Sequence, residues 1–346
     1  MTQITDGGER DHRTAPCVGT VVRTVSNFYD VLPAESSADG QIVRCRARQT
    51  LRKQLIRSES HGRPQRVQAV TRLPVMEPVA IGDRVRFTPS PGSGIDVPQG
   101  VIEEVLPRTR ELSRQAVTTG RVPVGQVLVA NLDLVILVFA AADPFPSPGL
   151  IDRFLVSCES RDLPALICIN KVDLDIDEAL VHDLATYESA GYRVLRVSAA
   201  TGAGLDTLRA EVKDKISAFV GPSGVGKSTL LNALEPGIRL RVGEVSQATG
   251  KGTHTTRFAQ LIPLSFGGFL ADTPGLRALG LWAVSKDELD RFFPEFRPYL
   301  GSCRFGNCAH ADDAGCAVRD AVERGQIDPR RYASYVKLFT ETSETA

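Results

Sequence analysis

Residues 221–228 read Gly-Pro-Ser-Gly-Val-Gly-Lys-Ser, and this motif is the strongest indication of the fold of the central part of the chain. It matches the pattern G-x-x-x-x-G-K-[ST], in which backbone N–H groups surround phosphates and a helix begins at the lysine. The apolar stretch 216–220 precedes it, and the helical sequence STLLNAL follows. We expect Lys227 to reach the β- and γ-phosphates of a nucleotide and the Ser228 hydroxyl to bind Mg²⁺. The stretch therefore predicts a phosphate-binding loop in an α/β domain.

Strands alternate with helices on both sides of this loop. Helical sequences cover 151–161, 178–189 and 205–214. Buried-strand sequences lie at 132–139, 165–169, 193–197, 216–220, 258–263 and 269–271. This alternation predicts a mostly parallel sheet with helices on its faces.

The base of the nucleotide is indicated by Asn170-Lys171-Val172-Asp173, directly after the apolar run ALICI. The Asp173 carboxylate can accept hydrogen bonds from N1–H and the 2-amino group of guanine, whereas adenine presents a lone pair at N1. A site built on such bonds rejects the wrong base strongly, because unpaired groups remain desolvated. Ser198-Ala199, after the next strand, is expected to offer backbone contacts to the guanine carbonyl. The pattern favours GTP.

Two further stretches are typical of segments that respond to the γ-phosphate. Asp272-Thr273-Pro274-Gly275 ends a strand; Asp272 is expected to hold Mg²⁺ through water and the Gly275 N–H to meet the γ-phosphate. Residues 250–256, Gly-Lys-Gly-Thr-His-Thr-Thr, suit a mobile loop. Either Thr255 or Thr256 would complete the magnesium shell, and the sequence leaves the choice open.

The order of these motifs is unusual. In ordinary small GTPases the phosphate loop comes first, whereas here NKVD and SA (170–199) precede it and DTPG (272–275) comes last. The same sheet has been cut and rejoined, a circular permutation that is tolerated because domain termini lie close together at the surface. DTPG then leads directly into the C-terminal segment, so we hypothesise that nucleotide-dependent motion passes to residues 276–346.

The C-terminal segment contains Cys303-x4-Cys308-x-His310-x5-Cys316. Three soft sulfur ligands and one imidazole make a closed tetrahedral Zn²⁺ site of the structural kind, with no open position for catalysis. The alternative, buried free cysteines, fits a window this short less well. The other four cysteines are scattered along the chain.

The N-terminal part is rich in short strands and in positive charge. Strand-like runs at 18–25, 28–32, 42–48, 67–70 and 84–87, separated by turn sequences, predict a small barrel of the OB type. Between residues 44 and 72 there are nine Lys or Arg and a single acid, Glu59. Such a stretch favours a polyanion-binding face. The candidate RNA-binding residues are Arg44, Arg46, Arg48, Arg52 and Lys53. Phe28 and Tyr29 are candidates for base stacking, with core packing the stronger interpretation.

Composition narrows the class of protein. The 346 residues are 42% hydrophobic and 24% charged, with 41 basic and 41 acidic side chains. These values are ordinary for a globular chain and exclude collagen, coiled coils and disordered proteins. The longest apolar run, nine residues at 134–142, is too short to span a bilayer, and the N-terminus lacks the pattern of a signal peptide. We expect a cytoplasmic, monomeric protein without membrane contact.

Together, the permuted order, GPSGVGKST, the GTHTT loop, DTPG and the cysteine–histidine spacing resemble the RsgA family, also called YjeQ or EngC. The resemblance covers about residues 17–340. It implies an OB barrel, a circularly permuted GTPase domain and a C-terminal zinc domain. It also implies slow GTP hydrolysis that the 30S subunit stimulates, release coupled to hydrolysis, and a role in late assembly of that subunit on its 16S rRNA.

The resemblance adds a catalytic candidate. Leu276 stands where many GTPases carry the glutamine that orients the attacking water. Members of the family share this replacement, and a histidine in the Gly/Thr loop is implicated instead, which is His254 here. Lys227 is the other catalytic candidate. The expected GTP-binding residues are Asn170, Lys171, Asp173, Ser198, Ala199, Gly221, Pro222, Ser223, Gly224, Val225, Gly226, Lys227, Ser228, Thr229, Asp272 and Gly275.

The expected organisation is multidomain, and two other functions stay open. We expect a disordered N-terminus (1–16), an OB barrel (17–106), a linker (107–126), a permuted GTPase (127–280) and a helical zinc-binding domain with a polar tail (281–346). One alternative is an RNA-binding assembly chaperone with a vestigial GTPase. Another is a GTPase that signals to a protein partner. A metabolic ATPase is disfavoured by Asp173.

Overall fold

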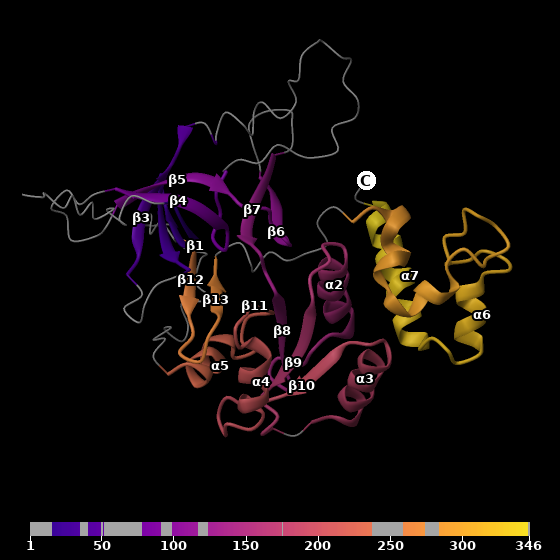
Figure 1. Ribbon diagram of the computed structural model, residues 1–346. Helices are drawn as coiled ribbons and strands as arrows, with labels where there is room; N and C mark the ends of the chain where they lie inside the picture. The colour runs from indigo at the N-terminus through magenta and orange to yellow at the C-terminus, as the bar shows by residue number, and fades with distance from the viewer. Residues whose placement is uncertain are drawn as a thin grey trace, which may run out of the picture. The chain divides into compact units, whose positions relative to one another are not determined.

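The computed structural model describes residues 16–34, 41–49, 51, 78–90, 99–116, 124–174, 176–236, 259–273 and 284–344. The chain forms two compact units. The first comprises Met1–Asn131 with Arg257–Leu261, and the second comprises Leu132–Thr256 with Ile262–Ala346. Figure 1 labels the elements of both units.

The first unit is built on a five-stranded barrel, as the strand pattern predicted. Its strands are β1 (Cys17–Val25), β2 (Phe28–Pro33), β3 (Val43–Ala47), β4 (Arg84–Ser90) and β5 (Gln99–Val105). The order is β1-β2-β3-β5-β4, and β4 also pairs with β1, which closes the barrel. Alternate side chains fill the interior, among them Tyr29, Val31 and Phe87. Strand β5 was not expected, and the predicted strand 67–70 lies outside the described residues.

The stretch expected to be a linker, 107–126, contains regular structure. Strand β6 (Glu111–Ala116) pairs antiparallel with β7 (Val124–Ala130) in a separate two-stranded sheet. The Asn131 side chain secures the base of this hairpin, because its Nδ2 donates to the Gly82 carbonyl at 2.9 Å and its Oδ1 accepts from the Thr109 N–H at 2.9 Å.

The second unit contains the expected parallel sheet. Its five parallel strands, in the order β10-β9-β8-β11-β13, are β10 (Arg193–Arg196), β9 (Ala165–Asn170), β8 (Leu134–Ala140), β11 (Ile216–Val220) and β13 (Phe269–Asp272). Strand β12 (Gln260–Pro263) contains the point in the chain where one unit gives way to the other.

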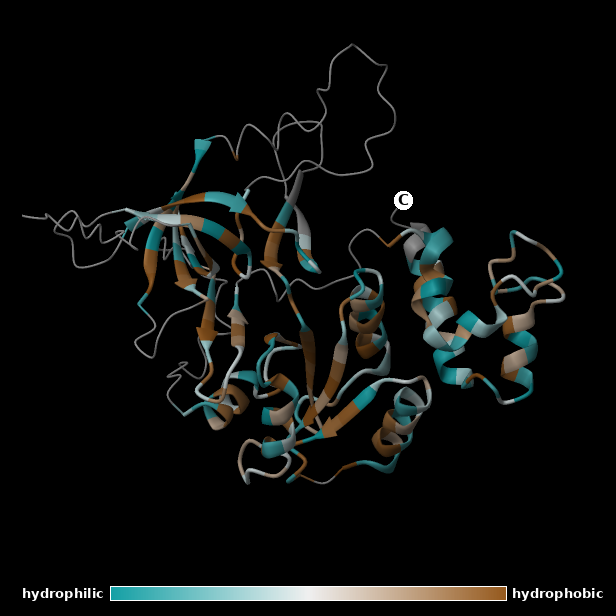
Figure 2. Cartoon of the chain, viewed as in Figure 1, coloured by the Kyte–Doolittle hydropathy of each residue, from teal (hydrophilic) through white to brown (hydrophobic). Residues whose placement is uncertain are grey.

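Strand β8 shows why this sheet lies between helices. All seven of its residues are buried, the pattern of a strand covered on both faces. Its even-numbered residues pack with α4 (Leu205–Val212) and α5 (Lys227–Leu234), whereas Phe139 makes an edge-on ring contact with Phe154 of α2 (Pro148–Glu159). Helix α3 (Glu178–Ser189) follows β9. The central strands are accordingly coloured as hydrophobic in Figure 2.

The C-terminal part of the second unit is helical. Its elements are the 3-10 helices η2 (Lys286–Phe292) and η3 (Pro294–Tyr299) and the helices α6 (Ala317–Glu323) and α7 (Pro329–Glu344). They share an apolar core in which Phe293 stacks on Phe296 and both contact Tyr335, and Val156 of α2 also belongs to this core. Among the described helices, none combines the length and the apolar character needed to cross a membrane.

Candidate functional site

The motif residues gather at one edge of the parallel sheet. Asn170 and Asp272 are the last residues of β9 and β13, Ser198 follows β10, and Gly221 follows β11. Because these strands are parallel, their carboxyl ends lie along the same edge. The chain adds β9 and β10 on one side of β8 and then β11 on the other, and open α/β sheets bind ligands where the order reverses in this way.

The phosphate-binding loop runs from β11 into α5, as expected. At Gly221 an added Cβ would lie 2.0 Å from the Val138 carbonyl oxygen, so only glycine allows the loop to leave the sheet here. Gly226 has φ +87° and is the N-cap of α5. A Cβ added at this position would lie only 2.5 Å from Asn170 Nδ2. The Lys227 ammonium donates to the carbonyls of Gly221 and Pro222, the first at 2.8 Å, which places it across the loop.

Asn170 joins the NKVD segment to the phosphate-binding loop. Its side chain is 2% exposed, its Nδ2 donates to the Val225 carbonyl at 2.9 Å, and its Oδ1 accepts from the Ala199 N–H at 3.1 Å. One amide therefore uses a donor and an acceptor to hold three segments that are far apart in sequence. Buried polar groups satisfied in this way position the surrounding backbone.

The charged residues of NKVD are also oriented by their neighbours. The Asp173 carboxylate accepts a hydrogen bond from the buried Ser198 hydroxyl and is itself exposed. The Ser198 Oγ in turn accepts from the Thr201 N–H at 3.1 Å. Lys171, at φ +63°, donates through its ammonium to the Asp143 carbonyl in the loop between β8 and α2. These contacts leave the carboxylate at the surface with one hydrogen bond already made.

The described residues hold part of the expected triphosphate-responsive site. Ser228 is buried at the start of α5, and Asp272 is exposed at the end of β13. The remaining candidates in this group, His254, Thr255, Thr256 and Gly275, lie outside the described residues, as does Leu276. Pro222, one of the expected GTP-binding residues, has no backbone N–H to donate to a phosphate.

The cysteine cluster forms one compact group of ligand atoms. The Sγ atoms of Cys303, Cys308 and Cys316 and a ring nitrogen of His310 all lie within 4.8 Å of one another. His310 Nδ1 is 3.4 Å from the sulfurs of both Cys303 and Cys316. Three thiols and an imidazole at this spacing fit a tetrahedral metal ion of the zinc type, with every position filled by the protein.

The surroundings of the cluster fit the same reading. His310 Nε2 lies 3.4 Å from an Asp290 carboxylate oxygen of η2, so Nδ1 is the nitrogen turned toward the sulfurs. A carboxylate behind a ligating imidazole fixes its tautomer and its direction. The backbone around His310, which has φ +58°, is held by the Tyr332 and Tyr335 hydroxyls, which donate to the carbonyls of His310 and Ala309 at 2.9 and 2.7 Å.

The candidate RNA-binding residues of the barrel are partly committed to other contacts. Arg44 pairs with Asp30 at 2.9 Å, and Arg48 pairs with Glu103 at 2.5 Å. Arg46 is exposed and lies over the Phe28 ring, 4.7 Å from its centroid. Arg52 and Lys53 lie outside the described residues. Tyr29 is 1% exposed in the barrel core, which confirms core packing rather than base stacking for this side chain.

The scattered cysteines inside the second unit have the properties of structural residues. Burial raises the pKa of the Cys158 and Cys168 thiols to about 12, so both stay protonated at neutral pH. An inert buried thiol behaves as a small apolar side chain. Neither residue belongs to the candidate site.

Sequence reasoning missed a buried ion-pair network between α2, η3 and α7. Arg331 of α7 is 3% exposed and pairs with Asp152 of α2 and, at 2.6 Å, with Glu295 of η3. Burial lowers the pKa of this guanidinium, but the two carboxylates more than offset that effect and raise the pKa overall. Nothing in the local sequence around 331 indicates such a partner, since Asp152 lies 179 positions away.

These features define a class of protein. A phosphate-binding loop and an NKVD segment joined by Asn170, in a sheet whose motifs run in permuted order, are those of a circularly permuted GTPase. A five-stranded barrel precedes this domain and a Cys3His cluster follows it. The comparisons agree: the sequence matches the RsgA GTPase family over residues 105–282, and the chain belongs to that family.

Individual relatives are similar over most of their length. The chain is 49% identical over 267 residues to the small ribosomal subunit biogenesis GTPase RsgA of Gemmatimonas aurantiaca, which covers 76% of this chain and 84% of that protein. It is 36% identical over 326 residues to the RsgA of Caldanaerobacter subterraneus, with 94% and 96% covered. Its structure resembles that of YjeQ from Thermotoga maritima, with a TM-score of 0.71 at 34% identity, covering 95% of this chain and 99% of that one. The structure of YloQ, a circularly permuted GTPase, gives a TM-score of 0.70 at 32% identity, with 97% and 98% covered.

Proposed function

We propose that this chain hydrolyses GTP to GDP and phosphate while bound to the small ribosomal subunit, and that it assists the late maturation of that subunit. The observation that carries the proposal is the joined guanine and phosphate segments, with Asn170 bridging both, in a chain of the RsgA family. Its relatives are named for biogenesis of the small ribosomal subunit, which supports the same partner here.

The nucleotide-binding roles follow from the placement of the side chains. The exposed Asp173 carboxylate, oriented by Ser198, accepts from N1–H and the 2-amino group of guanine. Lys227 exchanges its loop carbonyls for the β- and γ-phosphate oxygens, and the N–H groups at the start of α5 face the same phosphates. Ser228 and Asp272, with Thr255 or Thr256, would hold Mg²⁺. The ion would stabilise the negative charge that develops on the phosphate oxygens during hydrolysis.

His254 is the proposed group that orients the attacking water, because Leu276 has no polar atom with which to do so. A neutral imidazole can accept a proton or a hydrogen bond from water near neutral pH. Replacing His254 by Ala is expected to slow stimulated turnover and to leave GTP affinity unchanged. Unchanged turnover would remove His254 from the mechanism.

The two flanking parts have separate roles in the proposal. The Cys3His cluster binds one structural Zn²⁺ and holds the loop between η3 and α6 in shape. The barrel binds 16S rRNA through its basic face, where Arg46 over Phe28 offers both a charge and a stacking surface. Binding through phosphate contacts is expected to weaken steeply with rising salt, whereas a protein partner would give a shallower dependence.

The test is GTP hydrolysis by the purified protein alone, with 30S subunits and with 50S subunits, and with ATP as the control nucleotide. Strong stimulation by 30S subunits and by no other addition supports nucleotide, partner and reaction together. If 30S subunits leave the rate unchanged while GTP binds, the ribosomal role is refuted and a protein-partner GTPase is favoured. A Lys227→Ala variant that keeps its cellular role without turnover would favour the assembly chaperone.

A further inference from the structure

The C-terminal helices are attached to the GTPase domain at a place unrelated to their covalent connection. The chain reaches them from Asp272, on the side of the sheet expected to respond to the γ-phosphate. Their packing is instead against α2 and α3, the helices that follow β8 and β9. Along the chain, α2 precedes β9 and α3 follows the NKVD segment, so both are neighbours of the segment expected to bind guanine.

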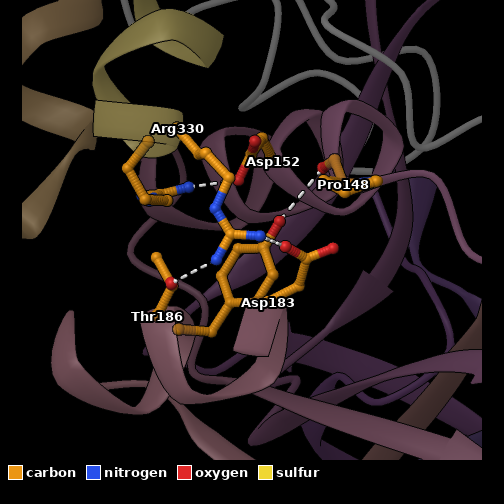
Figure 3. A pocket seen from close by; sticks show the side chains of 7 residues that line it. Pro148, Asp152, Asp183, Thr186 and Arg330 are labelled. Atoms are coloured by element: carbon orange, nitrogen blue, oxygen red, sulfur yellow. Dashed lines mark hydrogen bonds and ion pairs between the residues drawn. The ribbon is translucent and has the colours of Figure 1, made fainter. Parts of the chain in front are cut away.

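Two adjacent arginines in the first turn of α7 make this attachment. Figure 3 shows Arg330 with its guanidinium between Asp183 and Thr186 of α3. Arg330 pairs with the Asp183 carboxylate, and its Nη2 donates to the Thr186 hydroxyl at 3.1 Å. The Thr186 hydroxyl is also held by Asp328, which precedes α7, at 2.9 Å. Helix α3 is therefore tied to the start of α7 by charge and by hydrogen bonds.

Arg331 ties the same turn to α2. Its guanidinium forms an ion pair with Asp152. The guanidinium carbon lies 5.5 Å from the ring centroid of Tyr187 in α3 and 4.6 Å from the ring centroid of Phe293. The Tyr187 hydroxyl donates to the Pro148 carbonyl at 3.1 Å, at the first residue of α2. The two arginines thus fix the spacing of α2 and α3 relative to each other.

The loops that lead into α2 and α3 are in contact at the guanine end of the sheet. The loop before α2 contains Asp143, and the loop before α3 contains Lys171 and Asp173. These two loops meet where the Lys171 ammonium donates to the Asp143 carbonyl. A change in the separation of α2 and α3 is carried to this contact and hence to the NKVD segment, because packed helices move as rigid bodies.

We propose that Arg330 and Arg331 are positioning residues for the guanine site, so that docking of α7 on α2 and α3 sets how tightly guanine nucleotides are held. The inference rests on the proposed function, because it takes NKVD as the base-binding segment. A partner that separates α7 from α2 and α3 would then speed the release of nucleotide. A partner that stabilises the packing of α7 on these helices would slow that release. GDP and GTP respond equally, since they share the base. Coupling through the γ-phosphate side would affect GTP alone.

The test compares rates of release of fluorescent GDP and of a fluorescent non-hydrolysable GTP analogue. Arg330→Met removes an ion pair at a side chain that is 42% exposed. Arg331→Lys keeps the charge but loses the pair of hydrogen bonds that the guanidinium donates to the Glu295 carboxylate. Arg324→Met, on the exposed C-cap of α6, is the control. Couplings between sites are commonly about 5- to 150-fold, and we expect both nucleotides to leave about tenfold faster from Arg330→Met, with their ratio unchanged.

Three outcomes overturn the inference. These are wild-type release rates in a folded, zinc-bearing Arg330→Met protein, faster release of the GTP analogue alone, or equal acceleration by Arg324→Met. A second measurement needs only the wild-type chain, because coupling is reciprocal. Hydrogen exchange in α7 should slow when GDP binds, and unchanged exchange there refutes the coupling. Failure of the wild-type chain to bind GDP or GTP would instead refute the proposed function.

Discussion

Replacing Asn170 by Ala removes a side chain that joins the NKVD segment to the phosphate-binding loop. Two hydrogen bonds are lost: a buried one from Nδ2 to the Val225 carbonyl at 2.9 Å, and a partly buried one from the Ala199 N–H to Oδ1 at 3.1 Å. A buried donor or acceptor that is left without a hydrogen-bond partner costs about 1–3 kcal/mol of free energy. The cost is greater at Val225, which is 1% exposed, than at Ala199, which water can partly reach. The sum is about 3 kcal/mol.

We expect most of this loss in nucleotide affinity, because both segments must be in place to hold one ligand. At about 1.4 kcal/mol for each factor of ten, the full loss of about 3 kcal/mol corresponds to about 150-fold weaker binding of GDP, which is the upper limit of the expected effect. The assay is titration with fluorescent GDP, alongside thermal unfolding to measure any share that appears as lost stability.

The chain offers a matched control in the barrel unit. Asn131 makes the same pair of contacts, to the Gly82 carbonyl and from the Thr109 N–H, both at 2.9 Å. These bonds are more exposed than those of Asn170, so Asn131→Ala should lower stability by a smaller amount, and it should leave GDP affinity unchanged. The reasoning is refuted if Asn170→Ala binds GDP within threefold of the wild type without loss of stability, or if both variants weaken GDP binding equally.

Three further predictions follow from the same structure. Asp173→Asn should weaken GDP binding about 100-fold and favour xanthosine diphosphate, because an amide donates to the 2-oxo group of xanthine; competition between the two nucleotides measures this. Burial raises the pKa of the Cys158 and Cys168 thiols to about 12, so both should resist alkylation by iodoacetamide at pH 8. The half-buried Cys17 should react under the same conditions, and mass spectrometry identifies the modified residue. Cys316→Ser should reduce bound zinc from about one ion per chain toward none and lower the unfolding temperature; a zinc content equal to the wild type contradicts a metal role for the cluster.

Local sequence was sufficient wherever a structure depends on neighbouring residues. The loop 221–228 could be predicted because glycine spacing and a following helix are local properties, and Gly221 permits a backbone approach that any side chain would block. Strand β8 could be predicted from its unbroken apolar run, and the metal cluster from four ligands within 14 residues, 303–316. The barrel followed from short alternating strands.

Other features escaped because their signals are weak or non-local. Strand β5 pairs antiparallel with β4 and in parallel with β3. The sequence between β4 and β5, residues 91–98, is too long for a tight hairpin turn, and no strong apolar run marks β5 itself. Strand β6 also lacks a strong apolar run, and it lies inside the stretch 107–126 that was expected to be a linker. Polar residues in a strand carry little information about which neighbour they will pair with.

Residue type at short spacing was therefore enough to predict the chemistry of this protein. The expected phosphate, guanine and metal ligands follow from such local motifs, and the circular permutation can be inferred from their order. The tertiary structure decided which segments support that chemistry. Arg331 and Asp152 meet from 179 positions apart, and Lys171 meets Asp143 from 28 apart. The reason is physical. Most charged side chains lie in water, so the sequence does not show which arginine or aspartate will be buried. The packing of α7 on α2 and α3 buries Arg331 and Asp152, and buried charges must be paired.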